Sequence, residues 1–159
     1  MNHHIVRSGA LGWGIKDSFR GYLSRQADFS LNVDDGASVG AGNAVQFPLV
    51  EDRSEDVVWA TRGHAVFRAH GGMMRLSLRN PVVRLSGADL VMAFDVGSGP
   101  QGAEPDYFEV ARLVEVPSED PRQRAYRTFL LPDATGMFND MYDADSELDA
   151  VTVTTEVMS

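Results

Sequence analysis

The sequence contains no cysteine, a single lysine and no long apolar run. The absence of cysteine excludes disulfide bonds, iron–sulfur clusters, thiolate metal sites and a catalytic thiol. No stretch approaches the roughly eighteen consecutive apolar residues that a transmembrane helix needs. The first twenty residues also lack the charged segment followed by an apolar segment that marks an export signal. We therefore expect no membrane insertion, and the sequence as printed favours a cytoplasmic location.

The chain is acidic: 14 Lys and Arg against 23 Asp and Glu give a net charge of −9. Such a surface repels phosphate backbones, so nucleic acid is not an expected partner. A hydrophobic content of 43% and a charged content of 23% are typical of a folded domain, which excludes overall disorder. The length of 159 residues predicts one domain, over residues 9–157, after a disordered N-terminus at residues 1–8.

One amphipathic helix is predicted over residues 14–25. Apolar residues at Ile15, Phe19, Tyr22 and Leu23 follow the spacing of a single helix face. Gly21 lies inside this helix and costs about 1 kcal/mol relative to alanine, so we expect tertiary packing to hold the helix in place.

After residue 29 the apolar pattern alternates with a period of two, which is typical of strands with one buried face. Gly, Pro, Asn and Asp punctuate the segments at the spacing of turns. The predicted class is mainly β: a single-domain antiparallel β-sandwich or an open, barrel-like sheet, with the N-terminal helix packed on it and a short helix over 134–142. The expected strands are 29–33, 45–49, 57–61, 65–70, 74–78, 81–85, 90–96, 108–116, 125–131 and 151–157.

Three candidate motifs are better explained by structure than by chemistry. Residues 36–40 match the G-x-S-x-G nucleophile elbow, but a strand follows them where the elbow requires a helix. The acidic residues from Asp140 to Asp149 do not fit a calcium loop, because Leu148 stands where the EF-hand loop needs glycine. His64 and His70 lie about 20 Å apart along a regular strand, which is too far to bind one metal ion.

Tyr22 permits two interpretations, because it shares a helix face with Ser18 and Phe19. It can be a tyrosine at the edge of the core with its hydroxyl bonded to a backbone carbonyl, and the pattern alone favours this role. It can also be a phenolate ligand for ferric iron, as in heme proteins with an axial tyrosine. A free phenol ionises near pH 10, so ligation needs the charge of the iron and a hydrogen-bond partner, for which histidine is suited.

Two blocks of sequence resemble the heme-transport-associated (HtaA) domain family of actinobacterial heme uptake. Residues 11–22 are similar to the family pattern L-x-W-G-[VI]-K-x-S-F-R-x-Y, and residues 63–76 are similar to G-x-V-x-F-x-x-H-x-G-x-L. The resemblance covers about residues 9–157. The block at 137–142 departs from the glycine-rich, aromatic pattern of the family. By the resemblance, this block would form the far wall of the ligand pocket.

The resemblance implies a mostly antiparallel β-fold and non-covalent binding of heme, ferric protoporphyrin IX. On the matching positions, Tyr22 becomes the axial ligand of the iron and His70 the histidine that hydrogen-bonds it. This raises the ligand interpretation of Tyr22 above the structural one. Ser18 and Phe19 on the same helix face, with Phe138 or Tyr142 near the C-terminus, are the further candidates for contact with the porphyrin.

The expected function is heme uptake, transfer or storage, with other heme-transfer proteins as partners and a homodimer as an alternative to the monomer. One rival interpretation is a heme-free binding module of the same fold. A heme-dependent oxidase or peroxidase is a weaker rival, because the sequence offers no distal acid–base pair, and we expect no enzyme. Family members are usually exported and attached to the cell surface, in contrast to the location favoured above.

Overall fold

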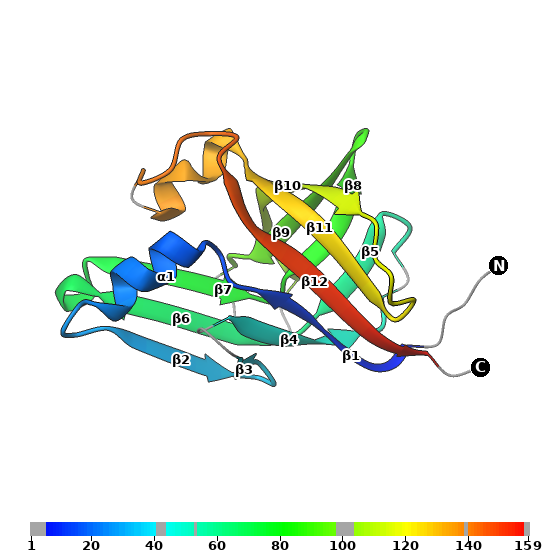
Figure 1. The fold of residues 1–159 in the computed structure, drawn as a ribbon, viewed down its shortest axis with the longest axis horizontal. Helices are drawn as coiled ribbons and strands as arrows, with labels where there is room; N and C mark the ends of the chain where they lie inside the picture. The colour runs from blue at the N-terminus through cyan, green and yellow to red at the C-terminus, as the bar shows by residue number, and fades with distance from the viewer. Residues whose placement is uncertain (1–5, 41–43, 53, 98–103, 139, 158–159) are drawn as a thin grey trace.

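The computed structural model describes residues 6–40, 44–52, 54–97, 104–138 and 140–157. These residues form two sheets, and all strand pairings among them are antiparallel. Figure 1 shows the larger sheet curling on itself, with the smaller sheet and helix α1 extending from one end. The mainly β class expected from the alternating pattern is confirmed.

The larger sheet closes into a barrel because β1 pairs with β12 on one side and with β4 on the other. A two-residue strand, β3 (Ser38–Val39), extends the sheet beyond β4. The order around the barrel is β1 (Val6–Trp13), β12 (Glu147–Val157), β11 (Gln123–Leu130), β10 (Tyr107–Val116), β9 (Asp89–Asp95), β8 (Val82–Ser86), β5 (Val57–Thr61) and β4 (Val45–Val50).

The smaller sheet contains β2 (Ser30–Asp34), β6 (His64–Ala69) and β7 (Met74–Arg79). A one-turn 3₁₀ helix, η2 (His70–Gly72), joins β6 to β7. Helix α1 (Asp17–Ser24) buries Phe19 and Leu23 in the same hydrophobic cluster as the inner residues of this sheet. A second 3₁₀ helix, η3 (Pro132–Phe138), follows β11 at the same end of the molecule (Figure 1).

Alternation explains why the strands form a closed core. Along β12, Val151 and Val153 are fully buried, whereas Thr154 between Val153 and Thr155 is exposed. Side chains of successive strand residues point to opposite faces, so one face fills the barrel and the other meets solvent. Among the described residues, no helix has both the length and the apolar character needed to cross a membrane.

The structure corrects three expectations about the chain. Val6 to Ser8, expected in a disordered N-terminus, belong to β1, a strand that the sequence analysis did not predict and that closes the barrel. The helix begins at Asp17 and not at residue 14, because the backbone turns at Ile15, where φ is +66°. His70, expected at the end of a strand, lies in η2.

Candidate functional site

Helix α1 places Tyr22 beside the core and not within it. Phe19 and Leu23 form the buried face of the helix, and Tyr22, one residue before Leu23, is half-buried at the edge of that face. Neighbours on a helix surface are three and four residues apart, so Ser18 and Tyr22 lie next to each other on the outer side. The phenol is therefore carried by a rigid element and remains partly open to solvent.

The hydroxyl of Tyr22 shares a hydrogen bond with Nε2 of His70. The centroids of the two rings lie 5.6 Å apart, with 46° between the ring planes. His70 is exposed and its φ is +56°, a left-handed conformation that non-glycine residues rarely adopt. The turn thus aims the imidazole back at α1, and the two residues that the sequence analysis paired, 48 positions apart, meet in space.

A carboxylate that the sequence analysis did not single out holds the His70 turn. Oδ1 of Asp28 accepts a hydrogen bond of 3.0 Å from the backbone N–H of His70, and Oδ2 accepts one from the backbone N–H of Gly71. The hydrogen bond from Gly71 is the largest cause that lowers the pKa of Asp28 below its ordinary value, and the charge of His70 adds to it. Asp28 therefore remains ionised and fixes the backbone from which His70 projects.

The aromatic candidates have different roles from those expected. Phe19 and Phe138 are both fully buried and pack edge to face, with centroids 5.5 Å apart, so they connect α1 to η3. Both were expected to contact the porphyrin, and in this structure both side chains lie in the core. Tyr142 is half-buried at the outer edge of this pair, and its hydroxyl lies 2.8 Å from the Ser18 hydroxyl. Ser18 and Tyr142 therefore meet the surface beside Tyr22.

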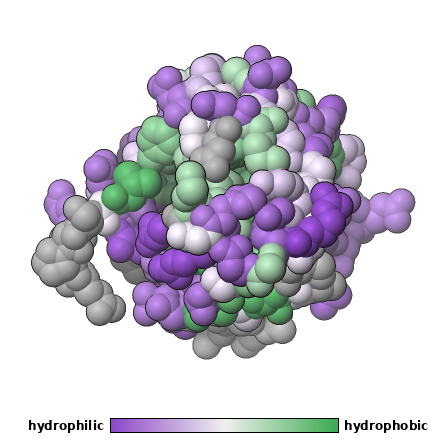
Figure 2. Space-filling view, turned by 90° about the vertical axis from the view of Figure 1, so that its left-hand side faces the viewer, coloured by the Kyte–Doolittle hydropathy of each residue, from purple (hydrophilic) through white to green (hydrophobic). Residues whose placement is uncertain are grey.

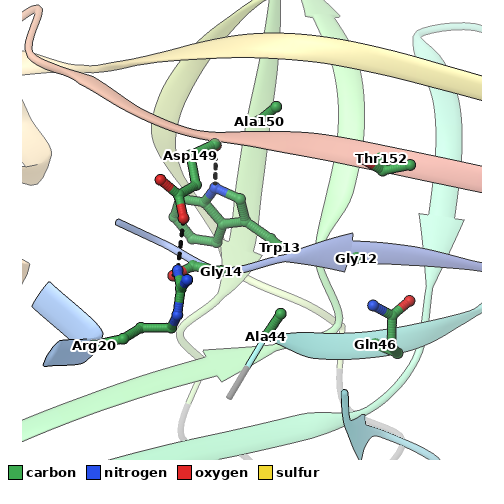
Figure 3. Close-up of a pocket in the computed structure, with 9 residues that line it drawn as sticks. All are labelled: Gly12, Trp13, Gly14, Arg20, Ala44, Gln46, Asp149, Ala150 and Thr152. Atoms are coloured by element: carbon green, nitrogen blue, oxygen red, sulfur yellow. Dashed lines mark hydrogen bonds and ion pairs between the residues drawn. The ribbon is translucent and has the colours of Figure 1, made fainter. Parts of the chain in front are cut away.

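The junction between β1 and α1 has an unusual backbone conformation that side-chain contacts hold in place. Ile15 has a positive φ although its side chain is β-branched and fully buried. Such a conformation costs about 1–3 kcal/mol and persists only where the surroundings impose it. Beside this junction lies a cavity of about 350 Å³, and in it Arg20 of α1 contacts Asp149 of β12 (Figure 3). Nη1 of Arg20 donates to Oδ2 of Asp149 at 2.6 Å.

His64 and the described acidic residues are not arranged to bind a metal ion. His64 is partly buried, which lowers its pKa, and its Nε2 lies 2.7 Å from the Ser77 hydroxyl on the neighbouring strand. No group of three or more His, Asp or Glu side chains within the described ranges is placed to hold a metal ion. Asp143 and Asp145 are exposed, as expected for a solvated loop, but Glu147 and Asp149 belong to β12. His3 and His4 lie outside the described residues.

Asp28, Arg20 and Asp149 were not predicted from the sequence, because each bonds to a group that lies far away in the sequence. One usable signal existed: Arg20 stands within the block at residues 11–22 that carries the resemblance. Nothing in the spacing identified Asp149 as the partner of Arg20.

The fold and the site define a closed antiparallel β-barrel domain that carries a helix-borne tyrosine, bonded to a histidine, at one end. The HtaA family model matches residues 8–154, which is most of the chain. The chain therefore belongs to the HtaA family, and the resemblance of the two sequence blocks is confirmed.

Solved structures from Corynebacterium glutamicum share the fold. The C-terminal domain of HtaA superposes with a TM-score of 0.72 at 18% identity, covering 96% of this chain and 98% of that chain. The N-terminal domain of HtaA gives 0.72 at 18% identity, covering 97% and 99%. The heme binding protein HtaB gives 0.69 at 16% identity, covering 97% and 96%. No curated protein sequence matches this chain.

Proposed function

We propose that this domain binds ferric heme, with Tyr22 as the axial ligand and His70 as its hydrogen-bonding partner. The observation that carries the proposal is the hydrogen bond between the Tyr22 hydroxyl and His70 Nε2 at an exposed end of the fold. Membership of the HtaA family supports it, as does the likeness in fold to a structure named as a heme binding protein.

The residues present fit the group. A phenolate is a hard, anionic oxygen donor of the kind that ferric iron accepts, and bound heme would supply that iron. His70 Nε2, carrying its proton, can donate to the ligating oxygen, which favours the ionised phenol and fixes its direction. Asp28 keeps the His70 turn in place from the other side. The chain thus offers one ligand, one donor to that ligand and one anchor.

Part of the surface at the α1 end of the molecule is apolar, which favours binding of a largely apolar molecule. Figure 2 looks onto the end of the molecule that carries α1 and η3, and apolar residues gather near its centre among polar ones. Met73, which follows the η2 turn that contains His70, is 87% exposed. Apolar surface of this kind gains free energy when a ligand covers it. The hydrogen-bonded hydroxyls of Ser18 and Tyr142 add polar groups next to Tyr22 on α1.

The proposed role is binding for heme uptake, transfer or storage, and not catalysis. Tyr22 and His70 lie at the surface, so a heme bound there would be reachable by another heme-transfer protein as well as by solvent. The proposed role is compatible with both locations considered above, the cytoplasm favoured by the sequence and the cell surface that is usual for the family. The heme-free interaction module and the homodimer remain as outcomes that the experiments below distinguish.

The test is a hemin titration followed by absorbance, with the wild type, Tyr22→Phe and Tyr107→Phe. Tyr107 is a matched control, because it is a half-buried tyrosine on β10 of the barrel and its ring contacts Arg84. We expect saturable, stoichiometric binding and a phenolate-to-iron charge-transfer band in the wild type and in Tyr107→Phe. Tyr22→Phe should lose the band and most of the affinity. His70→Ala should keep the fold, weaken binding and shift the spectrum.

Equal, non-saturating binding by the wild type and Tyr22→Phe would overturn the proposal and favour the heme-free module. A band that survives in Tyr22→Phe but disappears in another tyrosine variant would assign a different ligand. Loss of the Soret band with release of iron, on addition of reductant and oxygen, would show a heme-degrading enzyme instead of a carrier. Sedimentation of the heme-free and heme-bound forms distinguishes the monomer from the homodimer.

A further inference from the structure

We infer that Arg20 and Asp149 are positioning residues for Tyr22: together they lock the start of α1 to β12 and so set where the phenol lies. The inference rests on the proposed function of Tyr22. The structural part, that Arg20 and Asp149 fix α1 to β12, concerns the heme-free protein and is tested separately from heme binding. The pair lines the cavity shown in Figure 3, where the Arg20 side chain reaches from α1 to Asp149 on the neighbouring strand.

Helix α1 needs help from outside its own sequence. It has eight residues, which is below the length at which an isolated helix is stable in water. Its N-cap residue, Lys16, makes no side-chain capping bond. Oδ1 of Asp149 accepts a hydrogen bond of 3.3 Å from the backbone N–H of Asp17, and a negative charge at a helix N-terminus is favourable. A residue 132 positions away thus does the work of an N-cap.

Asp149 is itself held on β12 by backbone hydrogen bonds. Its N–H donates to the carbonyl of Ile15 at 2.8 Å, which restrains the residue that has the positive φ. Its carbonyl accepts hydrogen bonds from Trp13 Nε1 at 2.9 Å and from the Thr128 hydroxyl at 2.8 Å. Figure 3 shows the bond from the Trp13 ring and the bond from Arg20 meeting at this residue. The carboxylate therefore has a fixed base in the barrel.

Arg20 completes the connection from the helix. Its Nη1 donates to the Gly14 carbonyl at 2.5 Å as well as to Asp149, and its Nη2 donates to Oδ1 of Asp17 at 3.3 Å. Glycine at position 14 makes room for this arrangement, because a β-carbon there would collide with Nη1 of Arg20 and displace the guanidinium. The side chain of Arg20 is 15% exposed and that of Asp149 is 32% exposed, so the pair is partly shielded from water.

The consequence for Tyr22 is geometric. Tyr22 follows Arg20 by two residues on the same short helix, and its hydroxyl must meet His70, which projects from a different element. A rotation or slide of α1 moves the phenol directly, because one residue of an α-helix corresponds to a 1.5 Å rise and a large turn. Fixing the first turn of α1 against β12 therefore fixes the hydrogen bond between Tyr22 and His70.

The first test compares Asp149→Asn with Glu115→Gln in the heme-free protein by amide hydrogen exchange. Glu115→Gln is the matched control, because Glu115 forms a 3.0 Å ion pair with Arg124 on the barrel wall, and neither residue belongs to α1. We expect exchange of the α1 amides to accelerate roughly tenfold in Asp149→Asn, the effect of one lost charge-assisted hydrogen bond, and to be unchanged in Glu115→Gln. Unchanged exchange in Asp149→Asn would overturn the structural part.

The second test asks whether the pair acts through Tyr22. Hemin dissociation should be roughly tenfold faster in Asp149→Asn, with a shifted charge-transfer band, and Arg20→Lys should restore part of the loss seen in Arg20→Ala. In a Tyr22→Phe background, Asp149→Asn should have no further effect. An equal effect in both backgrounds would overturn the positioning role. If Tyr22→Phe alone leaves hemin binding intact, the proposed function fails, whereas the exchange result still stands.

Discussion

The barrel and the end that carries α1 are held together by different kinds of interaction. In the barrel, backbone ladders satisfy the polar groups and alternating apolar side chains fill the interior. At the α1 end, side chains bond to backbone groups: Asp28 to the His70 turn, and Asp149 and Arg20 to the β1–α1 junction. Left-handed non-glycine residues occur at both of these points, at His70 and at Ile15.

The difference indicates where stability and where function originate. A ladder depends on the backbone and on an apolar pattern that many residues satisfy, so the barrel can change sequence and keep its shape. The α1 end depends on particular carboxylates at particular positions, and its left-handed non-glycine residues lower the free energy of unfolding. We therefore expect barrel substitutions to act mainly on unfolding and substitutions at the α1 end to act mainly on heme binding.

The largest expected effect on stability is Phe47→Ala, which tests the barrel. Phe47 is fully buried on β4 and pairs in register with Leu11 on β1, at the seam that closes the sheet. Truncation leaves a cavity, and we expect the free energy of unfolding to fall by about 3–5 kcal/mol. Guanidinium denaturation measures the loss. Val114→Ala on β10, where the side chain is 41% exposed, is the control, with an expected change below about 0.5 kcal/mol.

If barrel and site are separate, hemin bound to the folded fraction of Phe47→Ala keeps its wild-type spectrum, because the hydrogen bonds described for Tyr22 and His70 go to α1, η2 and Asp28 and not to β4. A changed charge-transfer band in this variant would mean that the barrel and the site are one cooperative unit. The separation of stability from function would then be wrong.

The second prediction concerns Asp28 and pH. Because hydrogen bonds from Gly71 and His70 lower the pKa of Asp28 in the folded chain, its contribution is complete above the ordinary aspartate value of about 3.9. The contribution is lost as the pH falls through the lower, folded value. We expect the Gly71 amide resonance to titrate with a midpoint below about pH 3.9 in the heme-free protein.

Asp28→Asn should abolish that titration, lower the thermal midpoint slightly and speed hemin dissociation at neutral pH, because the His70 turn loses its anchor. Asp120→Asn is the control: Asp120 also accepts a backbone hydrogen bond, from Arg122, but in an exposed loop after β10. If both variants release hemin at the wild-type rate, Asp28 has no role in holding His70.

The same contrast explains what the sequence could predict. The strands follow from a pattern with a period of two, and each predicted strand is present with ends displaced by only a few residues. β1 was missed because glycines at positions 9 and 12 interrupt its apolar pattern. Gly9 has a φ of +155°, and a β-carbon there would meet the Thr154 carbonyl at 2.3 Å, so the backbones of β1 and β12 approach too closely for a side chain.

The candidate site was predictable only in part. Helix spacing singled out Tyr22, whereas the choice of Tyr22 as ligand and of His70 as its partner came from the family resemblance. Their meeting could not be deduced from spacing, since His70 lies in a turn that Asp28 holds through its backbone N–H. Phe19 was placed on the correct helix, but its burial depends on η3, a segment whose packing no local pattern reveals. Asp149 looked like one more residue of an acidic loop. Side-chain-to-backbone bonds between distant segments leave no periodic signal in a sequence.

The last prediction compares two glycines, Gly21 in helix α1 and Gly71 in the η2 turn. A β-carbon at Gly21 or at Gly71 would have no heavy atom within 4 Å, so both sites have room for alanine, but only Gly71 has a positive φ, of +63°. Gly21→Ala should raise the free energy of unfolding by about 0.5–1 kcal/mol, because alanine has less backbone entropy to lose in a helix. Gly71→Ala should lower it by about 1–2 kcal/mol, because the left-handed conformation is strained for any side chain. Chemical denaturation of the two variants measures both changes in the free energy of unfolding.

A gain in stability from Gly21→Ala with unchanged hemin binding would show that α1 can be stabilised without moving Tyr22. A gain accompanied by weaker binding would mean that the surface over Gly21 belongs to the ligand.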